Sequence, residues 1–87
     1  MKNTNKHGNF RCYCCDYFTL PEARDNSFEI CPVCYWEDDG IQSGDPSYEG
    51  GANTVNLITA RENFMEFAAS DECFKMSVRE PREDERQ

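Results

Sequence analysis

The sequence predicts a small α+β domain made of a zinc-ribbon-like β-hairpin with two cysteine turns, a Gly-rich acidic loop and one amphipathic C-terminal helix. Two C-x-x-C motifs, at 12–15 and 31–34, are separated by fifteen residues. Short runs of aromatic and β-branched residues flank the first motif and precede the second, as expected for strands. One helical pattern of apolar residues follows in the second half of the chain.

The ribbon is expected to span residues 9–36. Extended segments at 10–12 and 17–20 lead into and out of the first cysteine turn, and a polar turn at 22–26 reverses the chain. Residues 27–31 are expected to return as a strand, because apolar Phe28 and Ile30 alternate with polar neighbours.

A loop at 37–55 and a helix at 56–70 complete the expected domain. The loop contains four of the five glycines and has no sustained periodicity. Asn56 can cap the helix, and its apolar positions have helical spacing: Leu57, Ala60, Phe64, Phe67 and Ala68. We expect a single domain at 9–79, between a disordered N-terminal tail at 1–8 and a charged, disordered tail at 80–87.

Length and composition favour a metal as the stabilising element. A chain of 87 residues holds one small domain, and a core of that size rarely contributes more than about 3–5 kcal/mol by itself. The sequence shows no apolar leader and no long apolar stretch, which predicts a cytoplasmic protein with reduced thiols. The net charge of −8 disfavours nucleic acid as a partner, and the lack of a long apolar stretch disfavours a membrane.

The metal ligands predicted from the spacing are Cys12, Cys15, Cys31 and Cys34. Four thiolates can surround one Zn²⁺ tetrahedrally at about 2.3 Å, with no coordination position left for a substrate. We therefore expect one structural zinc ion. Iron uses the same four ligands in rubredoxin-like sites and is the alternative cofactor.

Three further candidate ligands or thiols have weaker support. Cys14 lies between two presumed ligands and is expected to be a non-ligand thiol, with replacement of Cys12 or Cys15 as the alternative. Cys73 has no partner at a metal-binding spacing and is expected to be a small buried hydrophobic residue. His7 is a candidate substitute ligand in the N-terminal tail.

An acidic run directly follows the second cysteine turn. Aromatic residues beside acids suit a protein interface, so the candidate partner-contact residues are Tyr35, Trp36, Glu37, Asp38 and Asp39. The alternatives are a solvated turn in which Trp36 closes the core, and a cation or acid–base site. No histidine or serine nucleophile lies nearby, so the run gives little support for catalysis.

These motifs resemble the bacterial cysteine-rich CPCC family from about Phe10 to Arg82. The resemblance is carried by the segments at 12–15, 20–22, 29–40, 50–53 and 60–64. Tyr13, Asp16 and Thr59 depart from the family pattern, in which proline, glycine and glutamate are usual. The resemblance implies a small zinc-binding domain. Genes for such proteins often lie near toxin or effector genes, which suggests an immunity or antitoxin role by association only.

The sequence thus predicts a non-enzymatic, zinc-stabilised protein-interaction module with an unidentified partner that is basic. A redox or iron-binding thiol protein is the first alternative. A nucleic-acid-binding zinc ribbon is the second, and the acidic charge disfavours it.

Overall fold

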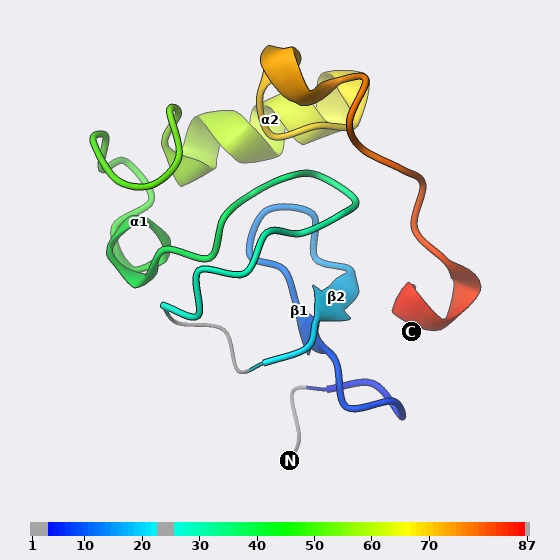
Figure 1. Cartoon of the computed structure of the whole chain (residues 1–87). Helices are drawn as coiled ribbons and strands as arrows, with labels where there is room; N and C mark the ends of the chain where they lie inside the picture. Colours follow the sequence, from blue (N-terminus) through cyan, green and yellow to red (C-terminus); the bar gives the residue numbers. More distant parts are fainter. Residues whose placement is uncertain (1–3, 23–25, 87) are drawn as a thin grey trace.

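The computed structural model describes residues 4–22 and 26–86. Along the chain lie strands β1 (Phe10–Arg11) and β2 (Phe18–Leu20), helices α1 (Gly40–Gly44) and α2 (Leu57–Phe67), and 3-10 turns η1 (Glu72–Phe74) and η2 (Glu83–Glu85). Helix α2 lies across one side of the molecule, over the loops that carry the cysteines (Figure 1). The described residues include no helix long and apolar enough to cross a bilayer.

The small two-stranded sheet confirms the expected hairpin around the first cysteine turn. β1 and β2 pair antiparallel, with Phe10 opposite Leu20. Arg11 lies opposite Phe18, so the register shifts between the two pairs. The zinc-ribbon-like fold class is therefore supported at the coarser level of a two-stranded sheet, a helix and a cysteine cluster. Three residues of the expected ribbon, 23–25, lie outside the described residues.

The expected strand at 27–31 does not form, and the prediction was wrong there. Phe28 has a φ of 58°, in the left-handed region that interrupts a strand. Only an isolated bridge joins Ile30 to Glu37, and the side chains of Phe28 and Ile30 are 49% and 52% exposed. The backbone of this segment hydrogen-bonds to residues 36–38. For example, the Phe28 N–H donates to the Asp38 carbonyl at 2.9 Å.

The loop expected at 37–55 contains a short helix, α1, which the sequence analysis did not predict. Asp39 is its N-cap, and its Oδ1 accepts the backbone N–H of Ile41 at 2.9 Å. An aspartate at this position satisfies helix N–H groups that would otherwise lack acceptors. A single turn of helix follows a cap of this kind even without a repeating apolar pattern.

Helix α2 confirms the expected helix, with a shorter C-terminal end. The Asn56 side chain accepts the Thr59 N–H at 2.7 Å and caps the N-terminus. The helix ends at Phe67, because Ala68 is left-handed with a φ of 65°. Beyond it, the Ser70 N–H donates to the Cys34 carbonyl at 2.8 Å, so the chain returns to the second cysteine turn.

Both ends of the chain make contacts in the parts that the structure describes. Asn5 donates from Nδ2 to the Asp84 carbonyl at 2.8 Å, which joins the two ends of the chain. Arg79 binds Glu85 through two contacts of 2.8 Å, and Glu85 is 5% exposed. The Arg79 backbone N–H donates to the Pro32 carbonyl at 3.2 Å, which joins this segment to the second cysteine turn. Residues 1–3 and 87 of the expected tails lie outside the described residues.

Candidate metal centre

The first cysteine turn is a tight backbone loop that directs two thiols to one side. The Asp16 N–H donates to the Cys12 carbonyl at 2.9 Å, and the Cys12 N–H donates to the Tyr17 carbonyl at 2.8 Å. Asp16 is left-handed, with a φ of 68°. Cys12 and Cys15 are both buried.

The second cysteine turn repeats the same backbone pattern. The Tyr35 N–H donates to the Cys31 carbonyl at 2.7 Å, and the Cys31 N–H donates to the Trp36 carbonyl at 3.0 Å. Tyr35 has the same φ of 68° as Asp16 in the first turn. Two matched turns therefore present four cysteine side chains to a shared interior.

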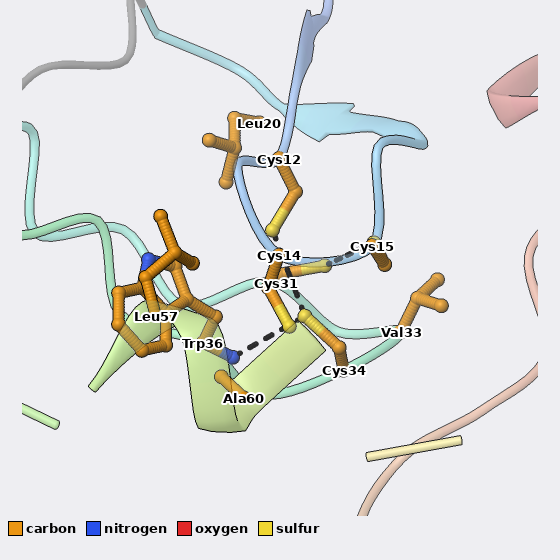
Figure 2. Close-up of a cluster of buried hydrophobic side chains, with 10 residues drawn as sticks. All are labelled: Cys12, Cys14, Cys15, Leu20, Cys31, Val33, Cys34, Trp36, Leu57 and Ala60. Atoms are coloured by element: carbon orange, nitrogen blue, oxygen red, sulfur yellow. Dashed lines mark hydrogen bonds between the residues drawn. The ribbon is translucent and has the colours of Figure 1, made fainter. Parts of the chain in front are cut away.

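The four predicted ligand cysteines form one buried cluster. Their Sγ atoms all lie within 4.8 Å of one another. The Sγ of Cys12 lies 3.6 Å from that of Cys34, and the Sγ of Cys15 lies 3.7 Å from that of Cys31. Sulfurs placed tetrahedrally around Zn²⁺ at about 2.3 Å are separated by about 3.8 Å. The cluster therefore has the dimensions of a four-thiolate metal site, and Figure 2 shows its sulfurs converging between the two turns.

A family model described as Cysteine-rich CPCC matches residues 10–85. The chain belongs to the cysteine-rich CPCC family. Among curated proteins, no sequence matches the chain. The match extends over both cysteine turns, helix α2 and the C-terminal segment, so it includes all the residues of the cluster.

The thiols of this CPCC protein polarise one another. The pKa of Cys31 is lowered, because the thiols of Cys12, Cys15 and Cys34 hydrogen-bond to its thiolate. The pKa of Cys34 is raised, first by burial and then by its hydrogen bond with Cys12. A buried cluster of this kind retains several thiolates at once only when a cation offsets their charge.

An apolar shell encloses the cluster of the CPCC domain. The buried apolar residues around the sulfurs come from both turns, β2 and α2: Leu20, Val33, Trp36, Leu57 and Ala60. Trp36 is 1% exposed, as expected if it closes the core. With four protein ligands and this shell, a metal in the cluster would be shielded from water and substrates.

The remaining candidate ligands lie outside the four-cysteine group. Cys14 is buried but is not one of the four. Cys73 is exposed, so the prediction that it is buried was wrong; it follows the surface cap Asp71 at the start of η1. His7 is exposed, with its Nε2 3.8 Å from the Asp84 carboxylate rather than at the sulfurs.

The acidic run of the CPCC domain is largely internal. Asp38 and Asp39 are 1% and 5% exposed. The Oδ2 of Asp38 accepts the Ser27 hydroxyl at 2.7 Å. The Oδ2 of Asp39 accepts the Ala52 N–H at 2.8 Å, which lowers the pKa of Asp39. The predicted contact surface is corrected accordingly.

Buried Trp36, Asp38 and Asp39 cannot present their side chains to a partner. The two other residues of the predicted contact surface, Tyr35 and Glu37, are half-buried. The Tyr35 ring packs against Phe74, with centroids 5.1 Å apart. At most a small part of the predicted surface is therefore accessible.

Two side-chain amides, of buried Gln42 and half-buried Asn53, hold the Gly-rich loop, and the sequence analysis did not identify them. Gln42 is fully buried, and its Oε1 accepts the Asn53 N–H at 3.0 Å. Asn53 also exchanges hydrogen bonds with the Glu37 backbone, at 2.8 and 2.9 Å. A Cβ atom on Gly51 would lie 2.6 Å from the Asp39 Oδ2, so glycine is required there. The double glycine at 50–51 was the only available signal of this close approach.

Replacement of Asp16 by glycine is expected to stabilise the metal-loaded CPCC domain by about 0.5–1 kcal/mol, because glycine adopts a left-handed backbone without steric cost. Asp16 has this backbone and is exposed. Chemical denaturation of the loaded protein measures the change. Tyr35→Gly is the matched control, since it relieves the same φ but removes the ring packed on Phe74. Destabilisation by Asp16→Gly would show that the contact of Asp16 with Arg11 outweighs the backbone gain.

Proposed function

We propose that this CPCC protein is a small domain stabilised by one structural zinc ion, and that it acts by binding another protein rather than by catalysis. One observation carries the proposal: four buried cysteine Sγ atoms lie within 4.8 Å of one another on two matched turns. Zinc is the usual ion in structural sites with four cysteines. Iron in the same ligands is the alternative, which would make the protein an electron carrier.

The absence of an open coordination position supports a structural rather than a catalytic metal. Catalytic zinc sites keep one position for water or substrate, and this site supplies four protein ligands. The neighbouring carboxylates of Asp38 and Asp39 accept hydrogen bonds from Ser27 and from backbone N–H groups. Neither carboxylate is directed at the sulfurs by any of these contacts.

Charge supports a basic protein as the partner. The chain has a net charge of −8, and a zinc ion with four thiolates adds further negative charge. A strongly acidic surface attracts basic partners and repels phosphate-bearing ones. Exposed acidic residues occur on α2, on η1 and in the C-terminal segment, for example Glu62, Glu66, Glu72 and Glu80.

The test of the metal is native mass spectrometry and elemental analysis of the protein purified under reducing conditions. We expect one zinc per chain, and loss of that zinc in Cys34→Ser. Cys73→Ser is the matched control, because Cys73 is exposed and outside the group. A red protein that contains iron would show that the metal is iron and not zinc. A protein that is folded without metal would contradict the structural role.

The test of the partner is purification of the tagged protein from its own host at low and high salt. A basic protein bound in one-to-one ratio at low salt, and released at high salt, supports the proposal. Recovery of the zinc-loaded protein alone at both salt concentrations would contradict the interaction role and leave the zinc proposal intact.

A further inference from the structure

Thr19 is a buried polar residue beside the cysteine cluster. It lies in the middle of β2 and is 8% exposed. Its Oγ1 lies 2.9 Å from the Sγ of Cys31. A buried hydroxyl is normally hydrogen-bonded, and a metal-bound thiolate has no proton to donate. In the loaded site, the Thr19 hydroxyl is therefore the donor and the sulfur is the acceptor.

The hydrogen-bond donors to the cluster contact the sulfurs of the second cysteine turn, Cys31 and Cys34. The Trp36 backbone N–H lies 3.5 Å from the Sγ of Cys34. The Cys14 thiol also hydrogen-bonds to the Cys34 sulfur. Within residues 4–22 and 26–86, we find no hydroxyl or backbone N–H donor to the sulfurs of Cys12 and Cys15. Thr19 is thus the one side-chain hydroxyl of the described residues that contacts a ligand sulfur.

The charge of the site gives this contact its importance. A divalent ion with four thiolates carries two negative charges, and apolar side chains such as Leu20, Val33 and Leu57 surround it. An apolar shell stabilises such charge poorly. The cation that interacts with Cys31, Arg79, is already paired with Glu85 through two contacts of 2.8 Å. Hydrogen-bond donors aimed at sulfur offset part of the negative charge.

Burial and strand propensity alone do not explain a threonine at this position. Valine has nearly the same shape, has a higher apolar transfer energy and is equally favoured in strands. A valine would leave the strand and the packing in place but would remove the donor to Cys31. The hydroxyl is the property that distinguishes the two residues here.

We propose that Thr19 is a positioning residue of the metal centre, whose hydroxyl donates to the Cys31 thiolate and so orients it, withdraws charge from it and strengthens metal binding. This inference rests on the proposed function, in which the four cysteines hold a metal ion. Partners of this kind around metal ligands typically change metal affinity 10–100-fold.

The experiment compares Thr19→Val and Thr19→Ser with the unmodified chain after loading with Co²⁺, and then measures zinc affinity by chelator competition. In Thr19→Val we expect the sulfur-to-cobalt charge-transfer band to move to lower energy and zinc affinity to fall about 10–100-fold. Thr19→Ser keeps the donor and should retain both properties. Thr54→Val is the control, since its hydroxyl bonds Asp71 away from the cluster.

Several outcomes would overturn the proposal. If folded Thr19→Val keeps the band and the affinity of the unmodified chain, Thr19 only fills space. If Thr19→Val does not fold, the unmodified protein loaded with ¹¹³Cd decides: a scalar coupling between the metal and the Thr19 hydroxyl proton supports the contact, and its absence contradicts it. An unmodified chain that binds neither Co²⁺ nor zinc would contradict both this inference and the proposed function.

Discussion

Removal of the bound metal is expected to unfold the whole domain. The regular structure of the described residues is slight: a sheet with strands of two and three residues, and α-helices of five and eleven. Half of the buried core cluster consists of cysteines, namely Cys12, Cys14, Cys15, Cys31 and Cys34. A structural zinc ion supplies about 10–16 kcal/mol of binding free energy. That is more than a core of this size contributes without metal, about 3–5 kcal/mol.

Circular dichroism and the dispersion of amide NMR signals measure this effect. A strong chelator with a reductant should abolish the helical signal and collapse the amide spectrum, and added zinc should restore both. Single serine substitutions at the four ligands should have the same consequence without chelator. Cys73→Ser should leave the spectra unchanged, because that thiol is exposed. A native spectrum in the stripped protein would show that apolar packing alone suffices.

The four-cysteine cluster could be predicted from the sequence because its geometry is largely local. Each C-x-x-C turn is closed by backbone hydrogen bonds within six residues, so spacing alone indicates which side of the chain its thiols occupy. Helix α2 was predictable for a similar reason, since the Asn56 cap and the apolar spacing lie within one segment. In both cases the determining contacts are short in sequence.

The incorrect predictions concern contacts between distant segments. Alternation at Phe28 and Ile30 indicated a buried strand face, but a left-handed residue turns the segment toward residues 36–38. The role of Thr19 depends on where Cys31 is placed in space, which no spacing rule gives. Aromatic residues beside acids indicated that the run at 35–39 was a contact surface, but a carboxylate is also a strong acceptor for backbone N–H groups.

The buried carboxylates of Asp38 and Asp39 are expected to be needed for folding. The combined change Asp38→Lys with Asp39→Lys is expected to destabilise the domain by at least about 3–5 kcal/mol, the usual cost of leaving a buried charge without its partner. The Asp38 carboxylate accepts two hydrogen bonds from Ser27, at 2.7 and 3.0 Å. The Asp39 carboxylate caps α1 and accepts the Ala52 N–H. Lysine provides neither acceptor.

Glu37→Lys is the control, because it reverses one acidic charge at the position just before Asp38. Glu37 is half-buried, and it bonds the Asn53 side chain through its own backbone N–H and carbonyl, so this variant should fold and bind metal. Denaturant unfolding of the metal-loaded proteins separates the two cases. If the acidic run acts at the surface, lysine at any of the three positions should leave folding unchanged and abolish only partner binding. A structural role requires that the changes at Asp38 and Asp39 lower the free energy of unfolding and that the change at Glu37 does not. The three residues carry the same charge, but only Asp38 and Asp39 are buried, with carboxylates that accept hydrogen bonds.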